Sequence, residues 1–343
     1  MPIVNQSMIA KELNVSRATV SKALKGTDDI SVDMKKRVQD LAEKMNYIPH
    51  YHARRLHSQK TKTIGVVVPD VSNTFFSYAI DGIMDVAVNA GYHIILTVSR
   101  EKSEIEKTNL LNLLSMRVDG LLVAVSRETK KNQIFLKVKR SEVPLVFFDR
   151  AIDELGFSSV GIDDRGAALK LTNFVVQCGY RKIGHLAGSS IIGIGKDRCA
   201  GYLDSLKQNR IPVRRDWIVE GGFDRKDGYR GFKTIWNSSE KPEVIFAAND
   251  HIALGVYDAM REMNIAFPDK VGVVAFSHHD FAQILNPKLT IINVDPYLLG
   301  NKAMELMLTC IGEGKGCMKK ILVDAEIEVG ESLRVPESVG RVA

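Results

Sequence analysis

Cysteine is scarce in this sequence. The 343 residues include four cysteines, Cys178, Cys199, Cys310 and Cys317, and no CxxC pair. Metal and redox sites need clustered thiolates, so we expect four reduced, buried thiols. No apolar run approaches the roughly 20 residues that a membrane-spanning helix needs. Residues 1–6 lack the basic and then apolar pattern of a secretory signal, so we expect a cytoplasmic protein without membrane contact.

Catalytic and cofactor motifs are also lacking. Neither GxSxG nor HExxH occurs. The glycine-rich stretch 188–196 ends in Gly195-Lys196-Asp197 and lacks the spacing of a phosphate-binding loop. His278 and His279 are adjacent, and adjacent side chains normally diverge, which disfavours a metal site there. The sequence therefore predicts no enzyme, no cofactor and no metal ion.

Positive charge is concentrated near the amino terminus. The net charge is +6 for the whole chain. Residues 1–62 hold 12 Lys and Arg against 6 acidic residues, so this segment alone carries the entire excess. Such asymmetry is typical of a polyanion-binding segment, although a basic solvated face would give the same count.

The basic segment has the pattern of a helix-turn-helix. Apolar residues predict one helix over residues 8–13 and a second over residues 17–24. Ser16 is placed to cap the second helix, Gly26 to end it, and a third helix begins after Ser31. Two short helices joined by such a turn form the DNA-binding motif, although a generic helical hairpin would share the apolar pattern.

The second helix presents polar and basic side chains outward. Arg17 and Lys22 can donate to guanine, Ala18 can meet a thymine methyl, and Ser21 can reach a base or a phosphate. Thr19, in the first turn, is placed for a phosphate contact. This chemistry suits the major groove of DNA.

These residues carry a resemblance to a known family. The string Ile9-Ala10-Lys11-Glu12-Leu13-Asn14-Val15-Ser16-Arg17-Ala18-Thr19-Val20-Ser21-Lys22-Ala23-Leu24 closely resembles the headpiece of the lactose-repressor/galactose-repressor family, as do Asn46-Tyr47-Ile48-Pro49 and Ala53-Arg54-Arg55-Leu56. The resemblance implies that residues 49–62 form a hinge helix and linker that fold on DNA. In the family, a leucine at the position of Leu56 wedges into the minor groove, while Arg54 and Arg55 would hold phosphates. The expected DNA contacts are Ser7, Ser16, Arg17, Ala18, Thr19, Ser21, Lys22, Arg54, Arg55 and Leu56.

From Thr63 onward, short apolar runs alternate with amphipathic segments. Strands are predicted at 64–68, 93–97, 120–125, 145–148, 160–162, 183–186, 218–220, 244–247 and 272–276. Between the first two, Ile80, Ile83, Met84, Ala87 and Val88 have helical spacing. Continuous apolar strands between helices indicate parallel sheets covered on both faces, and their number exceeds one sheet.

The expected fold is an all-α helix-turn-helix headpiece followed by an α/β two-lobed core. The resemblance implies a core like the periplasmic sugar-binding proteins, in which the chain crosses between lobes near residues 160, 292 and 323. The headpiece spans 1–48 and the effector-binding and dimerisation domain 63–343. Its N-lobe covers about 63–160 and 293–322, and its C-lobe about 161–292 and 323–343.

Polar residues follow several predicted strands, where ligands bind in open α/β sheets. They are Asp70, Asp149-Arg150, Asp163-Asp164 and Asn249-Asp250, and each alone would more often be a helix cap. The family comparison adds Phe75-Phe76 and Arg198. One departure is Ala275-Phe276-Ser277-His278, where many relatives have Gly-Phe-Asp-Asp, so a usual effector-binding aspartate is replaced by serine. The expected effector-binding residues are Phe75, Phe76, Asp149, Arg198, Asn249, Asp250 and Ser277.

These features predict a dimeric transcription regulator, most simply a repressor. It would bind double-stranded DNA at a palindromic operator under control of a small molecule, expected to be a carbohydrate. A solute-capturing receptor would need an export signal and no headpiece. A nucleic-acid enzyme would need acid, base or metal residues converging in the cleft. The sequence indicates neither alternative.

Overall fold

The computed structural model describes residues 4–47, 60–129, 133–190, 193–314 and 316–339. The chain divides into two compact units, Met1–Thr61 and Lys62–Ala343. Among the described residues, no helix is both long enough and apolar enough to cross a membrane.

The first unit consists of helices α1 (Gln6–Glu12), α2 (Arg17–Lys25) and α3 (Val32–Lys44). The expected caps are confirmed. The Ser16 hydroxyl accepts a hydrogen bond from the backbone N–H of Thr19 at 3.0 Å. Gly26 ends α2 with a φ of +73°, which glycine adopts without strain. Ser31 caps α3 by accepting from Met34 N.

A small apolar core joins these helices. Its buried members come from all three helices and are Ile9, Ala10, Val20, Ala23, Val38 and Ala42. Val20 and Ala23 form the buried face of α2, with Leu24 half-buried beside them, and the opposite face is left to solvent.

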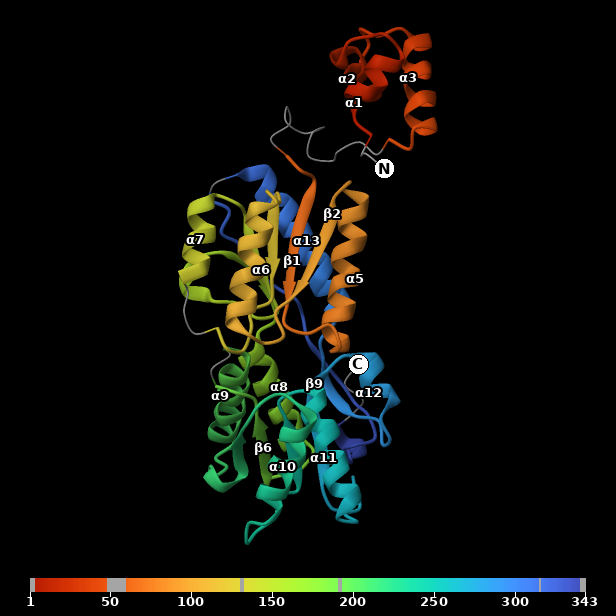
Figure 1. Cartoon of the computed structure of the whole chain (residues 1–343). Helices are drawn as coiled ribbons and strands as arrows, with labels where there is room; N and C mark the ends of the chain where they lie inside the picture. Colours follow the sequence, from red (N-terminus) through yellow and green to blue (C-terminus); the bar gives the residue numbers. More distant parts are fainter. Residues whose placement is uncertain (1–3, 48–59, 130–132, 191–192, 315, 340–343) are drawn as a thin grey trace. The chain divides into compact units, whose positions relative to one another are not determined.

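The second unit begins with the N-lobe, whose sheet has the strand order β11-β5-β4-β3-β1-β2. Figure 1 shows β1 and β2 side by side in this sheet. All of its neighbouring strands are parallel. The strands are β1 (Thr63–Val68), β2 (His93–Val98), β3 (Gly120–Val123), β4 (Leu145–Phe148), β5 (Ser158–Gly161) and β11 (Lys320–Leu322). The helices are α5 (Thr74–Asn89), α6 (Ser103–Ser115), α7 (Gln133–Ser141) and α13 (Pro296–Glu313), and a 3-10 turn spans Asp153–Leu155.

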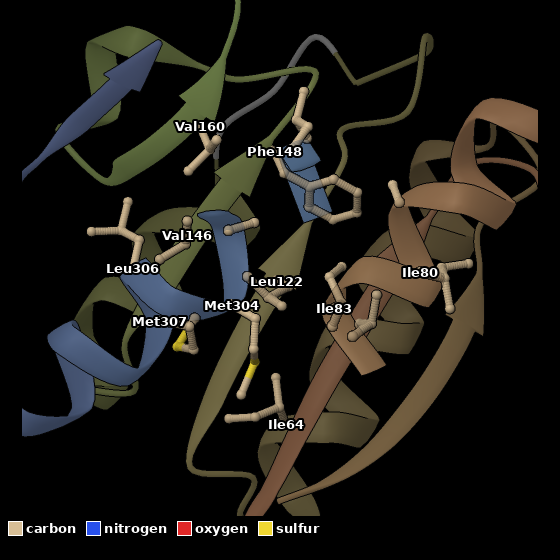
Figure 2. Packing of buried hydrophobic residues seen from close by; sticks show 14 of the residues in the cluster. Ile64, Ile80, Ile83, Leu122, Val146, Phe148, Val160, Met304, Leu306 and Met307 are labelled. Carbon is tan, nitrogen blue, oxygen red and sulfur yellow. The ribbon is translucent and has the colours of Figure 1, made fainter. Parts of the chain in front are cut away.

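Both faces of this sheet are covered, which explains its continuously apolar strands. Ile64 points toward α5 and α13, where it packs with Ile83 and Met304 (Figure 2). Val67 points to the opposite face, where α6 and α7 supply Leu113 and other apolar residues.

The helix expected between the first two strands is confirmed as α5, but only part of its apolar set is buried. Ile80, Ile83 and Ala87 are buried as their helical spacing predicts, but Met84 and Val88 are 45% and 69% exposed. The reason is geometric: α5 packs against the sheet and α13 through one face only, and these two side chains lie outside it.

The C-lobe repeats the arrangement with the strand order β12-β10-β9-β8-β6-β7, in which only β12 is antiparallel to its neighbour. Its strands are β6 (Ile183–Ala187), β7 (Ile218–Glu220), β8 (Val244–Ala247), β9 (Gly272–Ser277), β10 (Thr290–Asn293) and β12 (Glu326–Glu328). Its helices are α8 (Asp164–Gln177), α9 (Gly193–Gln208), α10 (Arg225–Trp236), α11 (Asp250–Glu262) and α12 (His279–Ile284). Short 3-10 turns span Arg215–Trp217 and Glu337–Val339.

The chain passes between the two sheets after β5, after β10 and after β11. Strands β10, β11 and β12 were not among the sequence predictions. They have three or four residues each, and in β11 and β12 several side chains are exposed, so no continuous apolar run marks them. The three crossings place the carboxyl ends of both sheets next to the same space.

The prediction of four reduced thiols is wrong for two of them. Cys310 and Cys317 form a disulfide with Cα atoms 5.3 Å apart. Cys178 is free and buried as expected, whereas Cys199 is free but only half-buried. Cys310 lies near the end of α13, and the chain then reverses through Gly314 and Gly316, both with positive φ. This reversal brings the two Cα atoms within the range of disulfide geometry. The signal missed was the run of glycines between two cysteines seven residues apart.

Candidate functional site

All seven predicted effector-binding residues line one cavity in the second unit. Its empty space, open mouth included, is about 530 Å³. It lies beyond the carboxyl ends of β4, β8 and β9, as the rule for open α/β sheets predicts. The lining residues are Asn73, Phe75, Phe76, Asp149, Arg150, Ile194, Arg198, Phe223, Asn249, Asp250, Phe276, Ser277 and Val294.

The N-lobe wall is formed by the start of α5 and the residues after β4. Asn73 caps α5 by accepting from Phe75 N, which fixes the direction in which the helix begins. The Phe75 and Phe76 rings meet edge to face with centroids 5.4 Å apart. Their apolar faces suit a ring-shaped ligand.

Asp149 and Arg150 add charge to the same wall. Arg150 Nη1 donates to both carboxylate oxygens of Glu101, at 2.8 and 3.1 Å. Asp149 is only 15% exposed and pairs more loosely, with 3.7 Å from its Oδ2 to Arg150 Nε. Burial raises the pKa of Asp149 to about 6 despite the opposing charge of Arg150. Its backbone φ of +60° is uncommon outside glycine, and such strain often accompanies a functional position.

The C-lobe wall is organised around Arg198. Its Nε donates to Asp164 Oδ1 at 2.7 Å, and its Nη1 donates to the carbonyl oxygen of Ala248 at 2.5 Å. The guanidinium carbon lies 3.8 Å from the centroid of the Phe276 ring, a cation–π arrangement. Burial raises the pKa of Asp164, opposed by the charge of Arg198. These contacts hold the guanidinium flat in the cavity wall.

Residues at the start of α11 complete this wall. Asn249 caps the helix through Ile252 N, and its amide donates to the carbonyl of Phe223. Asp250 pairs with His251 Nδ1 at 2.8 Å, which raises the pKa of His251. Ser277 Oγ donates to Asp250 Oδ2 at 3.4 Å. Asn249 is therefore both a cap and a lining residue.

His278, the second residue of the departure from the family pattern, does not line the cavity. Its Nε2 lies 3.0 Å from Thr74 Oγ1, so it joins the end of β9 in the C-lobe to the start of α5 in the N-lobe. Arg127 and Asp224 form a second link between lobes, with 3.8 Å between Nη1 and Oδ2. The cavity wall thus comes from both lobes, and these pairs cross between them.

The remaining polar candidates have local structural roles. Asp70 accepts from Ser72 N and Oγ in the turn after β1, and Asp163 caps α8. The cavity is also lined by three apolar residues that the sequence analysis did not identify, Ile194, Phe223 and Val294. No motif or polar group in the sequence marks them as binding residues. Glu101 was missed as well, because it precedes α6 far from Arg150 in sequence.

In the first unit the predicted DNA-contacting residues gather on and beside α2. Ser16, Arg17, Ala18 and Lys22 are exposed, while Thr19 and Ser21 are half-buried. Thr19 Oγ1 lies 2.8 Å from Ser16 Oγ, so both hydroxyls belong to the cap. Ser7 is exposed near the start of α1. Arg54, Arg55 and Leu56 lie outside the described residues, and their roles stay predictions.

The protein combines a helix-turn-helix unit with a two-lobed core that contains a cavity large enough for a small molecule. This combination defines its class as a transcription regulator. Family models agree: residues 8–50 match "Bacterial regulatory proteins, lacI family", and residues 61–339 match "Periplasmic binding proteins and sugar binding domain of LacI family". The chain belongs to the LacI family of bacterial regulatory proteins.

Individual relatives cover nearly the whole chain. Catabolite control protein A of Priestia megaterium is 30% identical over 87% of this chain and 90% of its own length. The transcriptional repressor CytR of Escherichia coli K12 is 29% identical over 95% of both chains. Among solved structures, the lac repressor dimer bound to operator and the anti-inducer ONPF matches with a TM-score of 0.85 at 23% identity, over 96% of this chain and 99% of that one. This last likeness supports the two-lobed fold.

Proposed function

We propose that this chain is a cytoplasmic homodimeric repressor that acts by binding rather than catalysis. In this proposal α2 reads a palindromic operator, and a neutral carbohydrate in the core cavity changes the affinity for that operator. The observation that carries the proposal is the cavity itself. Its wall comes from both lobes, so a ligand there binds one arrangement of the lobes better than another.

The charges around the cavity support a neutral ligand. Arg150 has Glu101 as its carboxylate partner, and Arg198 has Asp164. The arginines therefore do not leave a surplus of positive charge for a phosphate or carboxylate group. Asp149 and Asp250 offer acceptors for hydroxyl groups, and the rings of Phe75 and Phe223 offer apolar faces. A hydroxyl-rich ring matches both features, and a solved relative, the regulator CelR, is a complex with cellobiose.

An exposed apolar face supports dimerisation. Met84 and Val88 on α5 are exposed, as is Leu96 on β2, the edge strand of the N-lobe sheet. Exposed apolar side chains on two neighbouring elements favour a protein partner. A second copy of the chain is our proposed partner, because a two-fold dimer places two copies of α2 on the two halves of a palindrome.

Selection of duplexes by the full chain tests the proposal. We expect the selected duplex to bind at least ~1,000-fold more tightly than a random duplex of equal length. Neutral monosaccharides and disaccharides would then be compared with their phosphorylated counterparts for their effect on that affinity. Absence of sequence preference would contradict DNA reading. A response to phosphorylated sugars alone would contradict the neutral ligand and leave DNA reading intact.

A further inference from the structure

A hydrogen-bond network holds the side chain of Lys22 at the end of α2. Lys22 Nζ donates to Asp29 Oδ2, and Thr27 Oγ1 donates to Asp29 Oδ1 at 2.6 Å. The backbone N–H and the hydroxyl of Thr27 both donate to the carbonyl of Lys22, each at 3.3 Å. Gly26, in its left-handed conformation, turns the chain so that residues 27–29 fold back beside the helix.

The position of this network makes Asp29 an unusual neighbour for DNA. Lys22 shares the exposed face of α2 with Ala18, because residues four apart lie on one side of a helix. Asp29 is itself half-exposed beside Lys22. The hydrogen bonds from Lys22 and Thr27 lower the pKa of Asp29, so its carboxyl group is ionised at neutral pH. A carboxylate at the edge of a DNA-binding surface repels phosphates and so weakens binding to DNA of any sequence. We therefore expect Asp29 to contribute to discrimination between DNA sequences and not to overall affinity.

We propose that Asp29 is a positioning residue that makes Lys22 a reader of guanine instead of a phosphate contact. A lysine side chain is a flexible point charge with three donors. Asp29 occupies one donor and leaves two for the O6 and N7 atoms of guanine, which lie side by side in the major groove. The carboxylate also balances the ammonium charge and weakens its attraction to phosphates of any sequence. This inference rests on the proposed reading of DNA by α2.

The test uses the full chain and four proteins: wild type, Lys22→Ala, Asp29→Asn and the control Asp28→Asn. Asn at position 29 has the same shape and retains an acceptor for Thr27, while Asp28 is an exposed neighbour that carries the same charge. Each protein selects its preferred duplexes from a random pool. Its affinity for the wild-type site and for a random duplex is then measured at several salt concentrations, and circular dichroism checks the helices.

We expect Asp29→Asn to lose the guanine preference at the base pair where Lys22→Ala also loses it. Its discrimination between site and random duplex should fall by about tenfold, the scale of one base contact. Its salt dependence on random duplex should steepen by about 0.9 per headpiece, as for one added phosphate contact. Asp28→Asn should retain the wild-type preference at every base pair.

Three other outcomes would overturn the inference, and each has a different meaning. Equal behaviour of Asp29→Asn and Asp28→Asn would mean that Asp29 contributes only charge. A changed preference at a different base pair would mean that Asp29 contacts a base itself. If Lys22→Ala kept the wild-type preference, base reading by Lys22 would be wrong. In that case the proposed function would still stand as long as wild type prefers its selected site.

Discussion

Two ion pairs of this protein, one in the headpiece and one in the core, differ in how far they are buried. On α2, Lys22 and Asp29 meet at the surface, with about half of each side chain exposed. In the cavity wall, Arg198 and Asp164 are about nine-tenths buried, and the guanidinium also bonds a backbone carbonyl. An exposed pair contributes little to folding, whereas each member of a buried pair depends on the other. Substitution of Lys22 or Asp29 should therefore have little effect on stability, whereas substitution of Arg198 or Asp164 should lower it.

The largest expected effect is the loss of Arg198. We expect Arg198→Ala to lower the free energy of unfolding of the core by about 3–5 kcal/mol, because Asp164 is left buried without its partner. Binding to the selected duplex should persist at temperatures where the variant is folded, while the response to the effector is lost. Urea unfolding and duplex binding measure the two effects.

The matched control is Arg165→Ala in the same lobe. Arg165 pairs with Asp204 at 2.6 Å between Nε and Oδ2, but its side chain is 60% exposed. We expect a much smaller loss of unfolding free energy than for Arg198→Ala, because an exposed ion pair contributes little to folding. Similar losses for the two variants would contradict the distinction between buried and exposed pairs. An effector response retained by Arg198→Ala would remove Arg198 from the effector site.

A second prediction concerns the pH dependence of stability. The pKa of Asp149 is raised from 3.8 to about 6 on folding, so its contribution to stability is complete below pH 3.8 and is lost as pH rises through 6. Asp149→Asn removes this loss, and Asn tolerates the positive φ at this position. Relative to wild type, the variant should gain about 2 kcal/mol in unfolding free energy between about pH 4.5 and about pH 7.5.

Urea unfolding at the two pH values checks this prediction, with Asp324→Asn as the control because Asp324 is exposed between β11 and β12. A difference between Asp149→Asn and wild type that is the same at both pH values would mean that Asp149 titrates alike in folded and unfolded chains. A gain in stability accompanied by a weaker effector response would indicate that Asp149 is kept for function.

The same contrast explains what could be predicted from the sequence. The headpiece depends on short-range signals: Ser16, Gly26 and the apolar pattern over residues 17–24 all act within a few residues, and the structure confirms the helix and its caps. The family resemblance and the ends of the strands pointed to Asp149, Asn249 and Arg198, which line one cavity. The ion pairs of the wall could not be predicted, because Glu101 meets Arg150 and Asp164 meets Arg198 only after the sheets form.

Short-range reasoning also failed where the tertiary arrangement decides the outcome. Met84 and Val88 have the spacing of a buried face, yet α5 turns them outward. Cys310 and Cys317 looked unrelated until the end of α13 and the following reversal brought them together. Strand β12 pairs through backbone hydrogen bonds at the edge of its sheet, where an apolar run is not required. The exposure of Met84 and Val88 and the pairing of β12 depend on elements distant in sequence, whereas the disulfide depends on a local reversal of the chain.

The smallest expected effect lies in the headpiece and concerns binding alone. Arg17 is exposed at the first position of α2, so Arg17→Ala should leave the unfolding free energy unchanged within about 0.5 kcal/mol. If Arg17 reads a base, the variant should lose about 1–3 kcal/mol of affinity for the selected duplex and the preference at one base pair. Arg37→Ala on α3 is the control, since it removes an equal charge from a different helix. An equal loss on selected and random duplexes for Arg17→Ala would make Arg17 a phosphate contact, and the exposed cluster on α2 would then contribute charge without sequence information.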